Sequence, residues 1–434
     1  MKQFKMKPFR GPVDICVSVP GSKSITNRAL LLAALTEGKS VLKGVLFSDD
    51  SRVFMEALRT LGYEIEVDED ACTVTIEGHG TCIPEKSGNV YVGSAGTAAR
   101  FLTAMLALSG GHYEVTSSDQ MKTRPMKPLL LALEALGVKF RYNEKPYAFP
   151  FTILGREEND CKQVFLNIDE SSQFLSALLL NGIFCEKGLN VELTGKRDAK
   201  AYVKISMRMM REFGCEMRQL GENSYEILPG QHYRAQTYQI EPDVSAACYF
   251  YARAAVNQGQ AKVRDVFMDS MQGDIQFLRV LEKMGCTLKE EKDGVRLENK
   301  KELTGVTERL SDFSDQTMTL AVVCAFAAGK SVITGVGHIR RQESDRLHGI
   351  YSELTRLGVS CCETEDGIEI VPGGFVCDKE HPVVIQTYED HRMAMAFAIA
   401  GTKLEGVVID DPMCCRKTFE NYFEILTNLD LSLE

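Results

Sequence analysis

The chain has 434 residues, of which 44% are hydrophobic and 25% are charged, a balance typical of ordinary globular proteins. Its net charge of −10 argues against a nucleic-acid-binding protein, and its apolar runs are shorter than the roughly 18 residues needed to span a membrane. Because the 14 cysteines include no C-x-x-C pair and the basic segment Met1–Arg10 is followed by Gly11-Pro12 instead of an apolar leader, we expect reduced thiols, a cytoplasmic location and no metal site.

The first predicted element is a helix that begins within Val19–Leu35. Pro20-Gly21 marks a turn, a polar run of Ser22–Arg28 follows, and the rest of the segment is apolar. Polar cap residues before an apolar run predict a helix N-terminus. Lys23 and Arg28 are cations, which this end of a helix normally disfavours. Together with the free N–H groups of the helix they predict a binding site for an anion.

The same arrangement recurs five more times along the chain. From Ser24 onward the helix starts are spaced by 72, 75, 72, 72 and 75 residues. A second helix follows in phase, and in five of six copies it ends in an apolar-x-x-apolar-Gly tail, whose glycine suits a left-handed helix C-cap. The later helix starts lie near Gly96, Ser171, Asp243, Asp315 and Asp390, and the tails end at Gly62, Gly137, Gly214, Gly285, Gly358 and Asp430. Six copies of one unit predict a repeat architecture of two domains with three units each.

The boundary between the two halves is predicted near Tyr238–Asp243. Residues 21–240 would form the N-terminal domain, and residues 1–20 together with 241–434 the C-terminal domain. The leading piece, Met1–Val19, contains one strand-like run, Ile15–Val19. Because the sixth unit ends with the chain, we expect this piece to complete the sheet of the last unit.

In the second and third units, polar residues gather at helix starts and after one strand. Gly93 and Gly96 would let the backbone approach a ligand closely at a helix start, as phosphate sites require. Arg124 lies in the loop Lys122–Pro125, where it is either a solvated cation or a clamp for a carboxylate or phosphate. Ser171-Ser172-Gln173 opens the third helix with three neutral hydrogen-bonding side chains, which favours a hydroxylated ligand.

The fourth unit is the least cationic and is interpreted as mainly structural, whereas the last two units carry more charge. Asp315 lies at the fifth helix start, where a helix cap is the default interpretation. The run His338–Arg346 holds five charged residues and occupies the place that Arg124 has in the second unit. Glu389–Arg392 opens the sixth helix, and the closing loop Asp410–Lys417 adds two more cations.

These groups indicate a chemistry if both halves turn their helix ends toward each other. The cations would bind two anionic ligands, and Asp315, Glu343 and Lys23 could carry acid–base steps. A nucleotide-binding loop is excluded at Gly38-Lys39-Ser40, because Ala33 stands where the pattern needs its first glycine. Since no dinucleotide fingerprint and no supported Ser-His-Asp set occur either, a transferase without a cofactor fits best.

Seven segments, in order over essentially the whole chain, together resemble the 5-enolpyruvylshikimate-3-phosphate synthase family of enolpyruvyl transferases. They are Pro20–Arg28, Gly93–Arg100, Arg124-Pro125, Ser171-Ser172-Gln173, Glu343–Arg346, Asp390-His391-Arg392 and Lys417-Thr418-Phe419. The resemblance implies an α/β fold of two domains, each with three βαβαββ units, and an active site in the inter-domain cleft. It also implies a cytoplasmic monomer that needs neither cofactor nor metal.

The implied reaction transfers the enolpyruvyl group of phosphoenolpyruvate to the 5-hydroxyl of shikimate 3-phosphate through a tetrahedral intermediate, and it releases phosphate. It would serve the biosynthesis of chorismate and the aromatic amino acids. By resemblance, phosphoenolpyruvate would be held by Lys23, Gly96, Arg124, Gln173, Arg346, Arg392 and Lys417. Shikimate 3-phosphate would be held by Lys23, Ser24, Arg28, Ser171, Ser172, Gln173, Tyr202, Asp315, His338 and Gln342. Lys23 would touch both ligands, Asp315 would take the hydroxyl proton, and Glu343 would deliver a proton to the methylene carbon.

Some positions depart from the family pattern. The chain reads Ala199-Lys200-Ala201-Tyr202 where the family has Ser and Lys-Pro-Tyr, His338 where Asn is common, and Gln342 where Lys is usual. Phe101 replaces a common Pro behind the Gly96 helix. Because the first three departures concern the acceptor, two alternatives stay open: transfer to another acceptor such as a UDP-amino sugar, and a non-catalytic paralogue. The loop Ser117–Pro128 lacks the Cys of the UDP-sugar enzymes, and retention of the catalytic residues argues against a paralogue.

Overall fold

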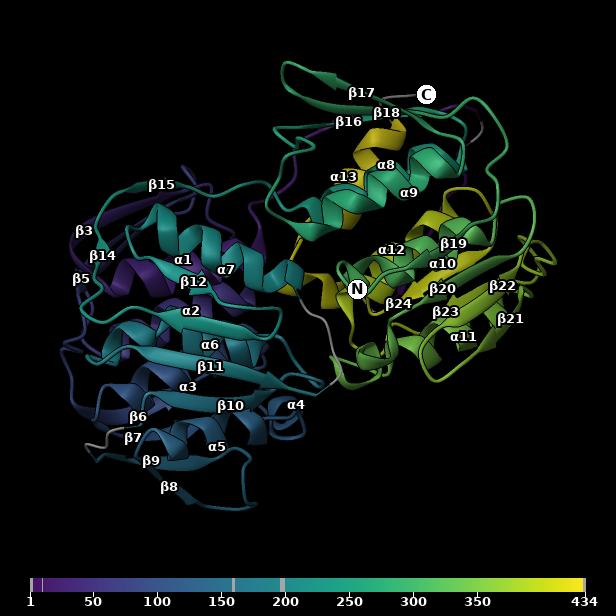
Figure 1. Cartoon of the computed structure of the whole chain (residues 1–434). Coiled ribbons are helices and arrows are strands. Elements are labelled where there is room, and N and C mark those ends of the chain that lie inside the picture. The colour runs from purple at the N-terminus through teal and green to yellow at the C-terminus, as the bar shows by residue number, and fades with distance from the viewer. Residues whose placement is uncertain (1–2, 10, 158–160, 196–199, 432–434) are drawn as a thin grey trace. The chain divides into compact units, whose positions relative to one another are not determined.

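The computed structural model describes residues 3–9, 11–157, 161–195 and 200–431 (Figure 1). It divides into two compact units, which we call the N-terminal unit (Gly21–Ile240) and the C-terminal unit (Met1–Pro20 with Glu241–Glu434). The strands of the described residues form six small sheets, three in each unit. None of the described helices is long and apolar enough to cross a membrane.

The second repeat shows the plan of one unit. Its elements are β6 (Ser87–Tyr91), α3 (Gly96–Leu108), β7 (His112–Thr116), the short α4 (Asp119–Lys122), α5 (Lys127–Ala135), β8 (Val138–Tyr142) and β9 (Phe151–Arg156). The strand β6 runs parallel to β7, β7 pairs antiparallel with β9, and β9 pairs antiparallel with β8. This is the βαβαββ unit that the resemblance implies.

The other two repeats of the N-terminal unit follow the same plan. The first has α1 (Lys23–Ala34), β3 (Thr36–Lys43), α2 (Asp49–Thr60), β4 (Ile65–Asp68) and β5 (Thr73–His79). The third has β10 (Gln163–Asn167), α6 (Gln173–Leu180), η1 (Gly182–Phe184), β11 (Leu189–Thr194), α7 (Lys200–Glu212), β12 (Met217–Gln219) and β13 (Ser224–Ile227). The first sheet gains its parallel strands from the end of the unit, because β14 (Tyr233–Arg234) and β15 (Thr237–Gln239) pair with β3.

The C-terminal unit contains the remaining repeats. The fourth has α8 (Val244–Val256), β16 (Gln260–Arg264), η2 (Gly273–Ile275), α9 (Gln276–Lys283), β17 (Thr287–Glu291) and β18 (Gly294–Glu298). The fifth has β19 (Thr307–Arg309), η3 (Ser314–Gln316), α10 (Thr317–Cys324), β20 (Ser331–Thr334), η4 (Gly337–Arg341), α11 (Arg346–Arg356), β21 (Ser360–Glu363) and β22 (Ile368–Val371). The sixth has β23 (Val383–Ile385), α12 (His391–Gly401), β24 (Val407–Asp410), η5 (Pro412–Lys417) and α13 (Tyr422–Leu431).

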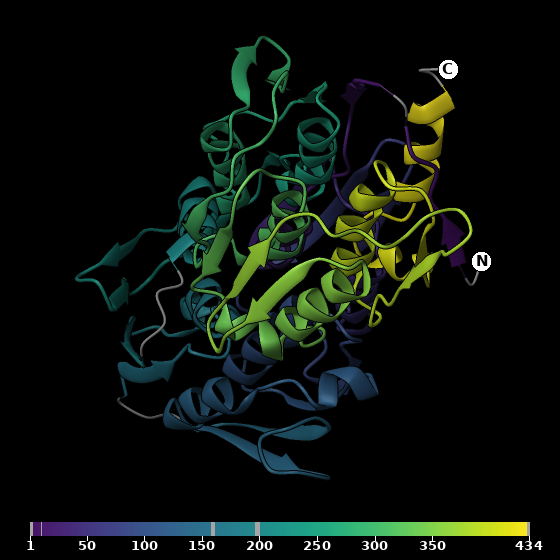
Figure 2. The same cartoon turned by 90° about the vertical axis from the view of Figure 1, so that its right-hand side faces the viewer.

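The leading segment supplies strands to two sheets of the C-terminal unit. The strand β1 (Gln3–Lys5) pairs antiparallel with β24 and so completes the sixth sheet, as predicted; in Figure 2 this purple strand lies beside the yellow end of the chain. The run Ile15–Val19, however, was assigned to the wrong sheet. It forms β2 (Asp14–Val17), which pairs parallel with β16 of the fourth repeat. That repeat has no preceding strand of its own in sequence order, so β2 takes the place that β6 has in the second repeat.

All six predicted helix starts are confirmed, and the helices that follow them form the core of each unit. Every residue of α3, α8 and α10 is buried, as expected of helices that are apolar on all sides. Within the units α3 packs on α1 and α6, and α12 packs on α8 and α10. The five tail glycines have the predicted left-handed backbone, with φ between 85° at Gly62 and 116° at Gly285. Each unit therefore directs three helix starts, with their polar residues, to the edge of a helical core.

Candidate functional site

The start of α1 brings a cation to a buried carboxylate. The Nζ atom of Lys23 lies 2.6 Å from Oδ2 of Asp50 in α2, and the Asp50 side chain is 6% exposed. One turn further along α1, Asn27 donates from Nδ2 to Oγ1 of Thr97 at 2.6 Å, which links α1 to α3. Asp50 was not among the residues predicted for the site. The structure places it beside the predicted catalytic Lys23.

Arg28 is buried, and its guanidinium binds groups of three helices. Its Nε donates to Ser206 Oγ at 2.8 Å and its Nη1 to the main-chain oxygen of Ser24 at 2.8 Å. Its Nη2 donates to Ser176 Oγ at 3.2 Å and to the main-chain oxygen of Tyr202 at 3.3 Å. Burial lowers the pKa of Arg28 to about 10, although Tyr202 opposes this shift, so the side chain remains charged at neutral pH. The predicted residues Ser24, Arg28 and Tyr202 are thus together, and their binding of the acceptor stays a prediction.

The starts of α3 and α6 meet at Gly96. A Cβ atom added to Gly96 would lie 2.7 Å from Arg100 Nη1, 2.7 Å from Arg124 Nη2 and 2.9 Å from Gln173 Oε1. Arg100 donates to Gln173 Oε1 at 2.5 Å and to the main-chain oxygen of Pro125 at 3.0 Å. Burial lowers the pKa of Arg100 well below its usual value, and the charge of Arg124 lowers it further. Two guanidinium groups against one glycine at a helix start form a site that an anion would stabilise.

Two neighbouring serines precede α6. Ser171 Oγ accepts a hydrogen bond from the main-chain nitrogen of Gln173 at 3.3 Å, and both Ser171 and Ser172 are buried.

Among the family departures, Ala199 lies outside the described residues. The side chains of Lys200 and Ala201 are likewise not described, so the consequence of the missing serine and proline stays a prediction.

In the C-terminal unit Asp315 is bound to two arginines. Its Oδ1 accepts from Arg346 Nη1 at 2.9 Å and its Oδ2 from Arg392 Nη2 at 2.8 Å. Arg346 also donates to both carboxylate oxygens of Asp390, at 2.7 and 3.2 Å. Burial opposes the charge of Arg346, but the carboxylates of Asp390, Asp315 and Glu343 outweigh it and raise the pKa of Arg346. Asp315 is therefore part of a charge network and not the helix cap of the default interpretation.

Glu343 lies where the fifth and sixth repeats meet. Its Oε2 is 3.0 Å from Nδ1 of His391, and it is 3.9 Å from both Arg346 Nη2 and Lys417 Nζ. Asp390 caps α12 by accepting from the main-chain nitrogen of Arg392 at 3.0 Å. The predicted residues Asp315, Glu343, Arg346, Arg392 and Lys417 thus form one cluster within this unit. The sequence motif contained Asp390 and His391, but their roles as partners of Arg346 and Glu343 depend on tertiary contacts.

Two residues expected at the acceptor bind neighbours in the same unit. Nε2 of His338 lies 2.8 Å from Ser314 Oγ, next to Asp315 in η3. Oε1 of Gln342 accepts a hydrogen bond from Arg346 Nη1, the same nitrogen that binds Asp315. Gln342 therefore adds a neutral acceptor to the Arg346 network, and contact of either residue with an acceptor stays a prediction.

A buried carboxylate, Asp274, lies behind Asp315. Its Oδ1 accepts from Ser245 Oγ at 2.9 Å and from Gln316 Nε2 at 2.8 Å. Burial raises the pKa of Asp274 to about 6, and the charge of Asp315 adds to this rise, while Arg392 and the Gln316 bond oppose it. Asp274 fixes the residue that follows Asp315, and no sequence motif singled it out.

Three potential metal-binding groups also lie in this cluster. One donor atom each of Glu343, Asp390 and His391 lies within 4.8 Å of the others. Arg346 binds Asp390, and Lys417 lies near Glu343. Protein cations therefore already balance these carboxylates, and we assign no metal to them.

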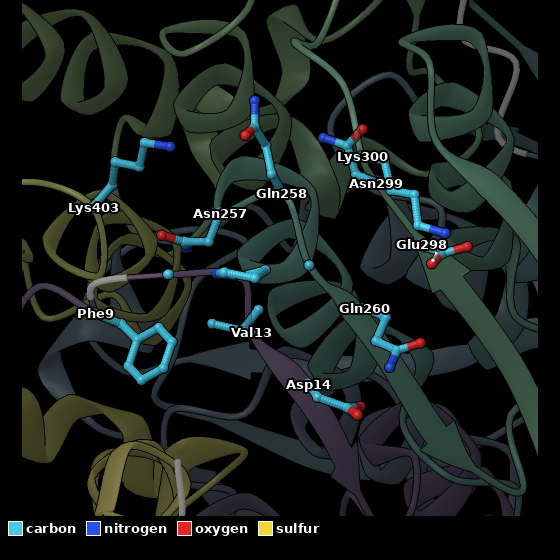
Figure 3. Close-up of a pocket in the computed structure, with 13 residues that line it drawn as sticks. Phe9, Val13, Asp14, Asn257, Gln258, Gln260, Glu298, Asn299, Lys300 and Lys403 are labelled. Atoms are coloured by element: carbon cyan, nitrogen blue, oxygen red, sulfur yellow. Dashed lines mark ion pairs between the residues drawn. The ribbon is translucent and has the colours of Figure 1, made fainter. Parts of the chain in front are cut away.

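A pocket of about 640 Å³ lies at the C-terminal end of α8 (Figure 3). The residues described as lining it include none of the predicted site residues. Asn257, Asn299 and Lys403 donate hydrogen bonds to main-chain oxygens of the last turns of α8, at 2.9, 2.6 and 3.0 Å. These polar side chains cap a helix end, so the pocket is interpreted as structural.

Comparisons with known proteins agree on one family. The family described as EPSP synthase (3-phosphoshikimate 1-carboxyvinyltransferase) matches residues 9–426. The chain is 40% identical over 426 residues to a 3-phosphoshikimate 1-carboxyvinyltransferase of Nostoc punctiforme, and 41% identical over 423 residues to one of Trichormus variabilis, covering 98% of both chains in each case. Among solved structures, EPSP synthase of Acinetobacter baumannii matches with a TM-score of 0.83 and 25% identity, covering 99% of this chain and 98% of that one.

Proposed function

The chain belongs to the EPSP synthase family, and from this premise we propose that it transfers the enolpyruvyl group of phosphoenolpyruvate to the 5-hydroxyl of shikimate 3-phosphate and releases phosphate. The cluster of Asp315 and Glu343 with Arg346, Arg392 and Lys417 gives this proposal its main support within the chain. It combines two carboxylates for proton transfer with three cations for an anionic substrate.

We assign phosphoenolpyruvate to the cationic groups of both units. In the N-terminal unit these are Lys23 and Arg124, together with Gly96 and Gln173, and Arg100 supports them from within the helical core. Arg346, Arg392 and Lys417 act from the C-terminal unit. A phosphate and a carboxylate carry enough negative charge to compensate several of these cations, and guanidinium groups match both geometrically.

Shikimate 3-phosphate is assigned mainly to the N-terminal unit. Ser24, Arg28, Ser171, Ser172 and Tyr202 provide hydroxyl and guanidinium groups from α1, α7 and the start of α6. Lys23 and Gln173 contact both substrates in this assignment. In the C-terminal unit, His338, Gln342 and Asp315 are assigned to the acceptor.

Two proton transfers follow from the carboxylates. Asp315 takes the proton of the 5-hydroxyl while the oxygen of that hydroxyl attacks the enol carbon of phosphoenolpyruvate. Glu343 gives a proton to the methylene carbon. The tetrahedral intermediate then loses a proton from the new methyl group and phosphate as the leaving group. Bonds to Arg346 and Arg392 favour the ionised form of Asp315, which can accept a proton. His391, 3.0 Å from Glu343, offers a path for protons to that residue.

One assay tests the reaction and its acceptor together. The protein is mixed with phosphoenolpyruvate and either shikimate 3-phosphate or UDP-N-acetylglucosamine, and phosphate release is measured. We expect phosphate release only in the mixture of phosphoenolpyruvate with shikimate 3-phosphate. Release with the UDP-sugar would instead assign the chain to the alternative acceptor, and no release with either would favour a non-catalytic paralogue.

The location and assembly follow from the same proposal. We place the enzyme in the cytoplasm, where its substrates would be made and where its 14 cysteines would stay reduced. We further propose that it works as a monomer, since each unit carries its own helical core. Light scattering on the purified protein should give a mass near 48.3 kDa, and twice that mass would contradict the monomer.

A further inference from the structure

A buried carboxylate of α11 holds the segment that leads into the cluster of Asp315 and Glu343. The side chain of Glu353 is completely buried. Its Oε1 accepts from the hydroxyl of Tyr388 at 2.7 Å, and its Oε2 accepts from the main-chain nitrogen of Gln386 and from Arg356 Nε, both at 3.0 Å. Arg356 belongs to α11 itself, whereas Tyr388 and Gln386 belong to the segment after β23. Because a buried carboxylate without partners is strongly unfavourable, these two donors keep α11 and that segment in fixed contact.

The segment after β23 has an unusual backbone. Tyr388 and Glu389 have φ angles of 55° and 56°, a left-handed conformation that is uncommon for residues other than glycine. Two consecutive residues in this conformation persist only where their surroundings hold them there. Asp390, His391 and Arg392 follow immediately, so the direction in which α12 presents these side chains depends on this turn.

The helix α11 is attached to the turn at two places. At its first residue, Arg346 donates to both carboxylate oxygens of Asp390. Two turns later, Glu353 binds Gln386 and Tyr388. Between them, a Cβ atom at Gly349 would lie 3.4 Å from Cε2 of Tyr388, at van der Waals contact, so the Tyr388 ring packs directly against α11.

We propose that Glu353 and Tyr388 are positioning residues, whose hydrogen bond fixes the turn 386–390 so that Arg392 faces the phosphoenolpyruvate and His391 stays beside Glu343. Tyr388 is 41% exposed, yet its hydroxyl is directed inward to the buried carboxylate. Burial, together with the Glu353 bond, raises the pKa of Tyr388 to about 12, so the hydroxyl keeps its proton at neutral pH. The substrate in this inference depends on the proposed function, whereas the fixed turn does not.

The test removes the hydroxyl alone. In Tyr388→Phe we expect the KM for phosphoenolpyruvate to rise at least fivefold, because Arg392 loses its fixed direction. The KM for shikimate 3-phosphate should stay within twofold, because most of its assigned residues lie in the N-terminal unit. Hydrogen exchange of the main-chain amides of residues 386–392 should accelerate at least tenfold.

Tyr251→Phe is the matched control. The Tyr251 hydroxyl is also in the C-terminal unit and donates to the main-chain oxygen of Val295 at 2.8 Å, so the control likewise deletes one tyrosine hydroxyl and its hydrogen bond. It should leave both KM values and the exchange of residues 386–392 unchanged. Equal effects in the two variants would overturn the proposal, as would unchanged exchange and KM in Tyr388→Phe.

A second variant keeps the test decisive. Glu353→Gln retains one acceptor oxygen but turns an N–H group toward donors, so its effects should equal or exceed those of Tyr388→Phe. Should this core variant fail to fold, Tyr388→Phe still decides the question, because it removes a single oxygen from a half-exposed residue. A wild-type protein that releases no phosphate would refute the proposed function, while the exchange measurement would still decide whether Glu353 and Tyr388 fix the turn.

Discussion

Replacing Asp315 by Asn should separate substrate binding from turnover, because Asp315 is bound to two arginines assigned to phosphoenolpyruvate. The two bonds measure 2.9 Å to Arg346 and 2.8 Å to Arg392, and the three side chains are 17%, 3% and 13% exposed. Hydrogen bonds to charged groups contribute about 1.5–3 kcal/mol each. Asn keeps one acceptor oxygen, so at least one bond is lost and one arginine becomes available to the substrate. If the released arginine makes an equally strong hydrogen bond to phosphoenolpyruvate, the affinity for phosphoenolpyruvate rises by about tenfold to hundredfold.

Turnover should move in the opposite direction. The variant lacks the carboxylate that accepts the hydroxyl proton, and loss of a general base lowers the rate by about 10²–10⁴. Phosphate release at saturating shikimate 3-phosphate measures the rate, and titration calorimetry measures the affinity for phosphoenolpyruvate. Asp312→Asn, an exposed carboxylate three residues earlier, is the control and should change neither quantity. Turnover of Asp315→Asn within tenfold of wild type would show that Asp315 is not the general base. A tenfold loss of affinity for phosphoenolpyruvate would show that Arg346 and Arg392 need the charge of Asp315 to stay in place.

Three further outcomes are expected. Gly96→Ala should raise the KM for phosphoenolpyruvate more than tenfold, because the added Cβ meets two guanidinium groups at 2.7 Å. The control Gly88→Ala has open space around the added Cβ and should leave the KM unchanged. Equal KM values in the two variants would contradict the site. Glu343→Gln should bind both substrates and lose about 10²–10⁴ in rate, measured by phosphate release, and near-normal turnover would exclude it as the acid. Asp274 has a pKa raised to about 6 by burial, against about 3.9 when unfolded, so its stabilising contribution is complete below pH 4 and is lost as the pH rises through 6. The free energy of unfolding of the wild type should therefore fall by about 1 kcal/mol more between pH 5 and pH 7 than that of Asp274→Asn, as measured by urea denaturation. The same pH dependence in both proteins would refute the assignment.

The features that sequence reasoning predicted correctly are local ones that repeat. A polar helix start such as Lys23–Arg28 and a helix-ending glycine such as Gly62 follow from residues a few positions apart. Their recurrence at a nearly constant spacing revealed the six repeats, although no single copy is conclusive. The cationic residues of each unit were also found in this way, because cations at helix starts are unusual.

The features that were missed depend on contacts between distant segments. Asp50 was not predicted for the site, because its partner Lys23 lies 27 positions earlier and in another helix. The hydrogen bond that the amide oxygen of Gln342 accepts from Arg346 was not predicted either, while the contact of Gln342 with the acceptor stays a prediction. Sheet order was similarly open, since β2 and β1 are both compatible with several partners until the sheets form. Periodicity identifies the elements, whereas the pairing of charges and strands depends on the tertiary fold.

The strands contributed by the leading segment also affect the order in which a growing chain can fold. The N-terminal unit pairs β3 with β14 and β15, so all of its sheets can be complete once residue 239 has left the ribosome. Residues 3–5 and 14–17 emerge before any of that unit, yet their partners are residues 407–410 and 260–264. They must stay unpaired while more than half of the protein is synthesised. Because an unpaired strand edge is open to wrong partners, the short length of β1 and β2, three and four residues, limits that hazard. The strand β1 is thus made before the N-terminal unit and paired only after β24.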